Sequence, residues 1–447
     1  MTLPLYSSLS LAMHPLVEKN DPRVVRSWAM FDWANSSYAL VISAAIFPAY
    51  FLSVTNATIS VGGNNLPNSS YYSFIISIAY IFVAAGSPIL SGMADYSGKR
   101  LFFLRLFTWV GSLSCISLFF FKGMGTLWLG TAGFMLASIG FTSSLVFYNS
   151  YLPVIATEEH YDKTSAKGFA YGYVGSVLLL IFNLVIIQKK EWFGIEDSGF
   201  AVRLAFITVG LWWLLFAQIP FNRLPSDSKE KFGKGIWQKG YHELLAVWHK
   251  LKKQAHLRRF LLAFFFYSAG VQTVLYLAAT FADTVLNFGG SELIVIILIL
   301  QLVGLVGAYL FASVSRVKGN KFALLTMLSM WILVCIAAFY TYTKFQFYLI
   351  AAGVGLVMGG IQALSRSTYS KLLDENETDL TSYFSFYDVL EKLAIVIGTF
   401  SFGYIDLISG GMRNSVLILI VYFAIGIALL TRVNMSGARR DVRLIQK

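Results

Sequence analysis

Long apolar segments alternate with short polar ones along most of the chain. Twelve of these segments, between residues 27 and 434, are each about 20 residues or longer, which as helices is enough to cross the roughly 30 Å of hydrocarbon in a bilayer. Their expected limits are 27–54, 71–96, 101–121, 125–156, 166–188, 200–222, 258–285, 291–316, 321–343, 345–370, 383–408 and 412–434. The pattern predicts an all-α integral membrane protein with twelve transmembrane helices.

Composition excludes a soluble domain, and the position of charge predicts the topology. Hydrophobic residues make up 57% of the 447 positions and charged residues 13%, about half the charged share of soluble domains. The net charge is +12. If the N-terminus is cytoplasmic, five of the 35 Lys and Arg residues lie in the outer connections: Lys122, Lys189, Lys190, Lys344 and Arg413. The positive-inside rule therefore predicts two cytoplasmic termini, with the basic surplus contacting anionic lipid and not nucleic acid.

An internal repeat divides the chain into two parts. Gly319 follows the eighth segment as Gly98 follows the second, and Tyr369 ends the tenth as Tyr151 ends the fourth. The two pairs are separated by nearly the same number of residues, which predicts two six-helix, pseudo-symmetric halves in the same orientation. The expected domains are an N-terminal tail at 1–26, halves at 27–222 and 258–434, a cytoplasmic linker at 223–257 and a C-terminal tail at 435–447.

The turn after the second segment carries a polar motif, SGMADYSGKR. Gly92 allows a close helix contact, and Gly98 allows a tight turn. Lys99 and Arg100 hold this turn at the membrane surface. Asp95 stands at the negative end of a helix dipole, so we expect it to cap or pair with a neighbouring helix. The motif resembles the signature loop between helices 2 and 3 of the major facilitator superfamily, although its first glycine stands three residues before the aspartate.

Three further motifs resemble one family within that superfamily. FDWANSSYALVISAAIFPAYF lies in the first segment, KTSAKGFAYGYVGS enters the fifth and GGIQALSRSTYSKLL ends the tenth. They are similar to the autophagy-related vacuolar effluxers and their bacterial relatives of unassigned substrate. The resemblance implies the major facilitator fold and alternating-access transport, with export of amino acids from the vacuole in eukaryotic members. It implies the plasma membrane for a bacterial chain and the vacuolar membrane for a eukaryotic one. Glu391 and Thr399 depart from the glycine and proline expected of the family.

Polar side chains follow one face of the first segment. Asp32, Asn35, Ser36 and Ser43 recur there at helical spacing among apolar residues. A charged side chain in hydrocarbon costs several kcal/mol unless it is paired or wetted. Asp32 and Asn35 are therefore candidates for a substrate-binding cavity, and Asp32 is also a candidate proton carrier. The alternative is that Asp32 reaches headgroup water and only joins neighbouring helices.

The eleventh segment carries three charged residues, Asp388, Glu391 and Lys392. Lys392 is roughly 15 Å into the span at 1.5 Å per residue, close to the bilayer midplane. Asp388 is one helical turn away and can pair with it. We expect Lys392 to meet a substrate carboxylate and Asp388 or Glu391 to take a proton, since desolvation favours the protonated acid. The alternative is a self-neutralised pair that merely tolerates burial.

Other polar side chains complete the candidate site. Amide and phenol groups expected in the spans add further substrate-binding candidates: Asn149, Gln272, Tyr276, Gln301 and Gln362. Each is equally suited to a hydrogen bond between helices. Ser365 and Arg366, at the inner end of the tenth segment, are candidates for a gate contact or for an anchor that faces phosphate.

The linker contains an amphipathic segment. Its apolar face consists of Trp237, Tyr241, Leu244, Leu245, Trp248 and Leu251, and basic residues flank it. This pattern predicts a helix in the inner membrane interface. Its role is either membrane anchoring or the binding of a regulatory partner.

Other protein classes fit less well. All five His residues lie outside the twelve segments, which leaves no buried base or metal ligand for an intramembrane enzyme. No G-x-x-x-x-G-K-[ST] run is present for ATP binding, and we expect no metal and no cofactor. The favoured function is secondary active transport of a small polar metabolite, an amino acid first, with efflux and proton coupling as hypotheses. The alternatives are transport of a sugar or peptide and a membrane scaffold or sensor without transport. The expected partners are the substrate and lipid, and the chain is expected to be monomeric.

Overall fold

A computed structural model describes residues 18–226, 235–374, 377–409 and 411–435. The predicted N-terminal tail up to residue 17 and the C-terminal tail from residue 436 lie outside this part of the chain. The described residues contain twelve helical spans that are long and apolar enough to cross a membrane. The predicted fold class, an all-α protein with twelve transmembrane helices, is confirmed.

The first half contains the elements α1 to α9. Its long elements are α1 (Pro22–Ser37), η1 (Tyr38–Ile46), α2 (Phe47–Val54), α3 (Asn68–Ser97), α4 (Arg100–Ser117), α5 (Leu127–Asn149), α7 (Tyr161–Gln188) and α8 (Ser198–Phe216). Short helices and turns complete these spans: η2 (Leu118–Phe120), η3 (Met124–Thr126), α6 (Leu152–Ile155), η4 (Glu158–His160), η5 (Lys190–Phe193) and α9 (Gln218–Phe221). A small antiparallel hairpin, β1 (Thr58–Val61) with β2 (Asn64–Pro67), connects the first two spans.

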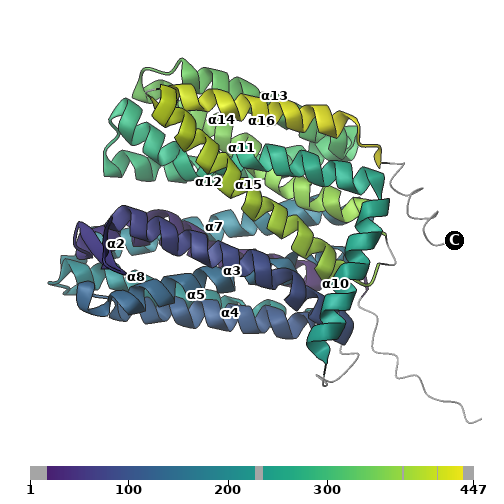
Figure 1. Cartoon of the computed structure of the whole chain (residues 1–447), viewed down its shortest axis with the longest axis horizontal. Helices are drawn as coiled ribbons and strands as arrows, with labels where there is room; N and C mark the ends of the chain where they lie inside the picture. The colour runs from purple at the N-terminus through teal and green to yellow at the C-terminus, as the bar shows by residue number, and fades with distance from the viewer. Residues whose placement is uncertain (1–17, 227–234, 375–376, 410, 436–447) are drawn as a thin grey trace, which may run out of the picture.

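The second half follows a connecting helix. That helix is α10 (Ile236–Lys253), and the spans after it are α11 (Ala255–Leu286), α12 (Gly290–Lys318), α13 (Asn320–Phe339), α14 (Lys344–Leu372), α15 (Leu380–Ser409) and α16 (Met412–Thr431). The two halves form two layers of helices, purple to teal and teal to yellow in Figure 1. α10 crosses one end of both layers, and we call that end the linker face and the opposite end the far face (Figure 1).

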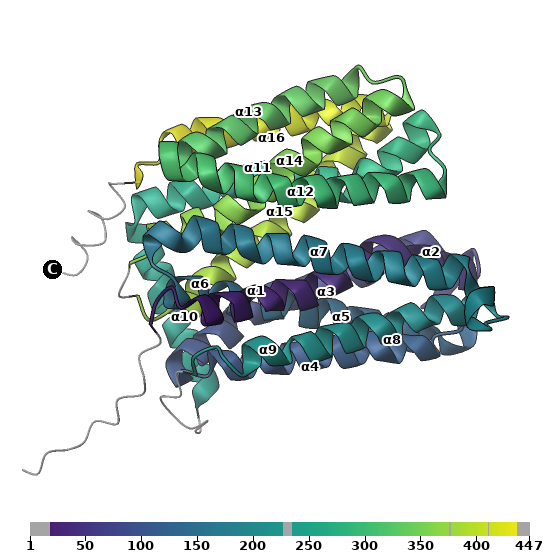
Figure 2. The ribbon, with the colours of Figure 1, turned by 180° about the vertical axis from the view of Figure 1, so that it is seen from behind.

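The halves meet through pairs of spans that the internal repeat relates. α3, in the second span, packs against α15, in the eleventh. α7, in the fifth span, packs against α12, in the eighth, and against α14. Figure 2 shows α7 and α12 as the neighbouring helices of the two layers when the molecule is seen from behind. Since the second span corresponds to the eighth and the fifth to the eleventh, the two interfaces are pseudo-symmetric, as the repeat predicts.

The first span is not a uniform α-helix. Residues Tyr38–Ile46 form a π-helix, and the Phe47 N–H donates to the carbonyl of Ile42, five residues back. Pro48 follows directly and has no N–H, while its ring would clash with the carbonyl of Ala44 in a regular α-helix. A wider turn before the proline relieves that clash. π-Helical turns are frequent at functional sites, and this one begins just after Asp32 and Asn35.

The SGMADYSGKR turn has the geometry expected from its glycines. α3 ends at Ser97, Gly98 takes a left-handed conformation with φ 64°, and α4 starts at Arg100. A Cβ atom at Gly92 would collide with the backbone carbonyl of Gly240, because α3 and α10 touch there without side chains between them. The helix contact predicted for Gly92 is therefore made with the linker helix.

A narrow stripe of α10 residues packs against the rest of the protein. Gly240, Val247 and Leu251 are buried, whereas Trp237, Tyr241 and Trp248 of the predicted apolar face are 61%, 50% and 40% exposed. The protein-facing stripe is thus offset from the aromatic stripe. Tryptophan and tyrosine favour the membrane–water interface, which is the environment expected for these exposed rings.

We expect Gly92→Ala to lower the apparent melting temperature of the detergent-solubilised protein. The new methyl group forces α3 and α10 apart, and overpacking of this kind costs about 1–3 kcal/mol. Gly86→Ala is the matched control on the same helix, because a Cβ atom there meets nothing within 4 Å. The control should be neutral or stabilising, since alanine is the better helix former. Equal melting temperatures for the two variants would contradict the α3–α10 contact.

Candidate functional site

Asp32 of α1 and Arg366 of α14 form a buried ion pair between the halves. Their exposed fractions are 4% and 3%, and Arg366 Nη1 lies 3.5 Å from Asp32 Oδ2. The Tyr148 hydroxyl donates to the same Asp32 oxygen at 2.7 Å. The Asp32 carboxylate is therefore neutralised by a group from the opposite half. The polar face predicted for the first segment is turned toward protein.

Arg366 is held on every side. Its Nε and Nη2 donate to the Ser165 hydroxyl and carbonyl, each at 2.9 Å, and Nη1 donates to Asn149 Oδ1 at 3.1 Å. The guanidinium also lies over the rings of Trp28 and Phe169, 4.8 Å and 4.4 Å from their centroids. The side chain thus bridges α14 to α1, α5 and α7.

Gly168 makes room for this ion pair. A Cβ atom there would stand 2.5 Å from Asp32 Oδ2 and 2.9 Å from Arg366 Nη2. Ser365, next to Arg366, shares a hydrogen bond of 2.7 Å with the Tyr267 hydroxyl. The end of α14 is therefore tied to both halves by neighbouring residues.

A second cluster lies on α15. Lys392 Nζ is 3.2 Å from Asp388 Oδ1 and 2.8 Å from Glu391 Oε2, and the Gln272 amide of α11 donates to Glu391 Oε1 at 2.9 Å. The side chains of Lys392 and Asp388 are 9% and 5% exposed, and that of Glu391 is 24% exposed. Within the described part of the chain, Asp388 Oδ2 is buried and has no hydrogen-bond partner. Lys392 lies roughly 18 Å along α15 at 1.5 Å per residue, so the cluster is at mid-depth.

Two hydrogen bonds join the halves near this depth. The Tyr80 and Tyr276 hydroxyls share one of 2.9 Å, and the Tyr173 hydroxyl donates to Gln362 Oε1 at 2.8 Å. Tyr276 is 44% exposed.

Two predicted candidates are not drawn into these networks. Asn35 is 1% exposed, and its Oδ1 atom has no hydrogen-bond partner among the described residues. Gln301 is partly buried on α12, and the described residues give it no hydrogen bond. Among the described residues, no hydrogen bond or ion pair joins either side chain to the charged clusters, so the sequence pattern alone did not distinguish them from Asn149, Gln272 and Gln362.

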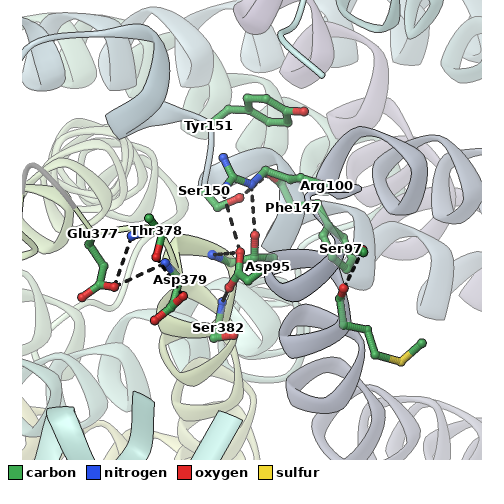
Figure 3. Close-up of polar contacts among 12 residues, drawn as sticks. Asp95, Ser97, Arg100, Phe147, Ser150, Tyr151, Glu377, Thr378, Asp379 and Ser382 are labelled. Carbon is green, nitrogen blue, oxygen red and sulfur yellow. Dashed lines mark hydrogen bonds and ion pairs between the residues drawn. The ribbon is translucent and has the colours of Figure 1, made fainter. Parts of the chain in front are cut away.

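The linker face is closed by a contact that involves the SGMADYSGKR turn. Asp95 accepts hydrogen bonds from the backbone N–H groups of Thr381 and Ser382, at 3.1 Å and 2.6 Å. Figure 3 shows Asp95 between Arg100 and the first turn of α15. Arg100 lies 3.7 Å from Asp95 and also donates to the Thr381 hydroxyl at 3.0 Å. Asp95 thus caps α15, the neighbouring-helix contact expected of it, at the positive end of that helix dipole.

A second closing contact lies at the related interface. Asp162, at the start of α7, accepts from the Ser315 hydroxyl at 2.6 Å and from the Asn320 amide at 2.7 Å. Lys371 Nζ donates to the same carboxylate at 2.7 Å. All three partners belong to the second half, and Asp162 is 5% exposed. The sequence analysis did not single out Asp162.

α10 is attached to the same end of α15. Lys250 Nζ lies 2.7 Å from Asp379 and 3.2 Å from Glu377, just before α15 starts. Burial, together with a hydrogen bond and the charge of Asp379, raises the pKa of Glu243 to about 7. The linker helix therefore contributes both a cation and a carboxyl that titrates near neutral pH to the linker face.

Twelve spans in two related halves, joined by buried charges, define a transporter of the major facilitator superfamily. The structure is similar to that of the superfamily transporter FucP in its outward conformation, with a TM-score of 0.71 and 13% identity over 93% of this chain and 99% of that one. The model of the family described as vacuole effluxer Atg22 like matches residues 20–163 and 157–443. The chain belongs to this family, as the sequence motifs predicted.

Two curated relatives span nearly the same length. The chain is 29% identical over 426 residues to the uncharacterized MFS-type transporter YxiO of Bacillus subtilis strain 168, covering 94% of this chain and 98% of that protein. It is 23% identical over 418 residues to autophagy-related protein 22 of Kluyveromyces lactis, covering 85% of this chain and 82% of that protein. The chain is therefore a multi-pass integral membrane transporter for a small molecule, and not an enzyme.

Proposed function

We propose that the chain is a secondary active transporter that moves a small polar metabolite by alternating access, with amino acids as the first substrates to test. The observation that carries this proposal is the cluster of Asp388, Glu391 and Lys392. It combines three charges at mid-depth with a partly accessible carboxylate. Charged groups within a membrane are costly and mark transport pathways, and substrates of this fold bind at the midplane between the halves.

The contacts between the halves support one conformational state. Asp95, Asp162 and Arg366 bridge the halves close to the linker face. Among the hydrogen bonds and ion pairs of the described residues that join the halves, the Tyr80–Tyr276 hydrogen bond lies nearest the far face, about 18 Å and 15 Å from the far ends of those helices at 1.5 Å per residue. The positive-inside rule assigns the linker face to the cytoplasm. The described state is then closed toward the cytoplasm, and transport requires these contacts to break.

Export and proton coupling are the finer parts of the proposal. The name of the family, vacuole effluxer, supports export. Asp388, Glu391 and Asp32 are the candidate proton carriers, because each is a carboxylate at membrane depth. The contacts with Lys392 and Arg366 favour the charged acids, while burial favours the neutral ones. A conformational change that separates a carboxylate from its cation would therefore promote protonation.

Liposomes containing the purified chain are expected to take up or release a radiolabelled amino acid at a rate that responds to an imposed pH gradient. Proton coupling predicts that dissipating the gradient with a protonophore lowers the initial rate. A panel of amino acids, sugars and dipeptides covers the competing substrate classes. The control is that the chain unfolds cooperatively and is inserted in the bilayer. If none of these solutes then crosses the membrane, the result contradicts transport and favours a scaffold or sensor.

Lys392→Ala tests the site within the same assay. Loss of the ammonium leaves two adjacent carboxylates without their cation, so flux should disappear while the melting transition persists. Lys344→Ala is the matched control, because Lys344 is the first residue of α14 and forms a 2.6 Å ion pair with Glu292 in which the two side chains are 42% and 36% exposed. Unchanged flux in Lys392→Ala would remove the cluster from the transport pathway.

A further inference from the structure

The charges of the α15 cluster do not balance. Lys392 is contacted by both Asp388 and Glu391, so one ammonium faces two carboxylates. Arg366, which lies closer to the linker face, is already paired with Asp32. With all these groups ionised, the α15 cluster retains one excess negative charge. An excess charge within a membrane is costly unless a ligand, a proton or water compensates it.

Glu391 is the member of the cluster that a ligand can reach. Its side chain is 24% exposed, against 5% for Asp388 and 9% for Lys392. The Gln272 amide holds one carboxylate oxygen and Lys392 the other, which fixes the direction of the group. Both contacts leave lone pairs on Glu391, since an ionised carboxylate has about four acceptor sites. The side chain is thus pre-oriented to accept another donor.

A second acceptor is built into the same site. Asp388 Oδ2 is buried and, among the described residues, has no hydrogen-bond partner. A buried acceptor without a donor costs free energy, about 1–3 kcal/mol as a general value. A ligand with N–H donors would satisfy it, whereas a ligand carboxylate would not.

Two tyrosines join the halves near the depth of this cluster. Tyr80 and Tyr276 are hydrogen-bonded to each other across the halves. The faces of aromatic rings attract cations, and the attraction is stronger where water is excluded. Rings and carboxylates together favour a positively charged group over a neutral or negative one.

We propose that Glu391 and the unpartnered oxygen of Asp388 bind the ammonium group of the substrate, and that preferred substrates carry a net positive charge. Basic amino acids and aliphatic diamines are the chemical class. The proposal rests on the transport function above and revises the role first expected for Lys392. That ammonium is occupied by two carboxylates, so a substrate carboxylate would add a third negative charge to the cluster. Lys392 instead acts as a positioning residue for Glu391.

Thermal-shift titration of the full chain in detergent at constant ionic strength tests the charge preference. The probes are cadaverine, lysine, leucine, glutamate and sodium chloride. Cadaverine and lysine should raise the melting temperature with increasing concentration, because a ligand that binds the folded state stabilises it. Leucine should act more weakly and glutamate not at all. Stabilisation by glutamate equal to that by lysine, or by sodium ions equal to that by cadaverine, would overturn the proposal.

Glu391→Gln links the binding to the proposed residue. The amide keeps the size of the side chain and removes its charge, so cadaverine affinity should fall about tenfold or more, as expected for losing a charge-assisted hydrogen bond. Glu292→Gln is the matched control, since Glu292 pairs with Lys344 at an exposed position. Equal cadaverine affinity in Glu391→Gln and the wild type would overturn the assignment.

Flux measurements separate this proposal from the transport function. Export or uptake of glutamate or leucine without cadaverine binding would support transport and overturn the ammonium site. Cadaverine binding that depends on Glu391, without flux of any solute, would support the site and contradict transport. Flux of lysine that is lost in Glu391→Gln and kept in Glu292→Gln would support both.

Discussion

Arg366→Met is expected to abolish transport and to destabilise the folded protein by about 3–5 kcal/mol, the usual cost of removing one partner from a buried ion pair. The variant leaves Asp32 in place with 4% of its surface exposed and with the Tyr148 hydroxyl as its remaining partner among the contacts described. It also removes the cation that lies over the rings of Trp28 and Phe169. Thermal unfolding and initial flux rates measure the two effects.

Arg366→Lys separates charge from geometry. An ammonium keeps the positive charge, but it is a point donor that cannot reproduce the planar fork. The fork reaches Ser165, Asn149 and Asp32 at the same time. We expect this variant to recover part of the stability while its flux stays well below that of the wild type. Arg413→Met is a control, because Arg413 donates to the carbonyls of Phe339 and Thr341 in the connection between spans nine and ten.

A double-mutant cycle with Asp32→Asn tests the pairing directly. Asp32→Asn removes the charge that Arg366→Met leaves unpaired, so the double variant should be more stable than the sum of the two single losses predicts. Residues in contact typically show coupling of about 0.5–3 kcal/mol. Strict additivity would show that Asp32 and Arg366 do not act as a pair.

Features determined within one segment could be predicted from the sequence. The spacing of Asp388 and Lys392 is a property of any α-helix, and the observed pair follows from it. The turn at Gly98 likewise follows from its glycine and the basic residues after it. The same reasoning indicated that Asp95 needed a partner from another helix, which is the start of α15.

Contacts between distant segments could not be predicted in this way. Asp32 and Asn149 were identified as polar residues within the spans and Arg366 as one at the inner end of the tenth span, but their meeting depends on how α1, α5 and α14 pack. Periodicity reports which face of a helix is polar and not which helix it faces. The π-helix before Pro48 was also missed, although the proline at the end of a polar stripe was a signal for a widened turn.

Asp162 was missed because what pointed to it was the lack of an acid at the corresponding position of the other half. The last turn of the second span has Asp95, whereas the corresponding position in the last turn of the eighth span is Arg316. In the structure the acid of this second interface comes from the opposite partner, Asp162 at the start of α7. The two interfaces are therefore related in position and reversed in the element that supplies the carboxylate. Because the last turn of the eighth span lacks the expected acid, the helix that faces it was the place to search for one.

Asp162→Asn is expected to shift the protein toward a state open at the linker face. Asp162 contacts Ser315, Asn320 and Lys371, and hydrogen bonds to charged groups are worth about 1.5–3 kcal/mol each. These contacts exist only while the halves are closed at this face, so their loss destabilises the closed state selectively. Losing even about 1.4 kcal/mol raises the open population roughly tenfold.

Spin labels at Lys163 and Lys318, which are exposed beside this contact on opposite halves, measure the shift. Cys115 and Cys335 are buried, so they compete little for the label. Asp162→Asn should add a longer component to the distance distribution, whereas Glu159→Gln, an exposed acid near the same end of α7, should leave it unchanged. Identical distributions in Asp162→Asn and the wild type would mean that the face stays closed without the Asp162 contacts. A longer component in Asp162→Asn would show that the Asp162 carboxylate helps to close this face. Its contribution would be separate from those of Asp95 and Arg366, because in the described residues neither of them contacts it.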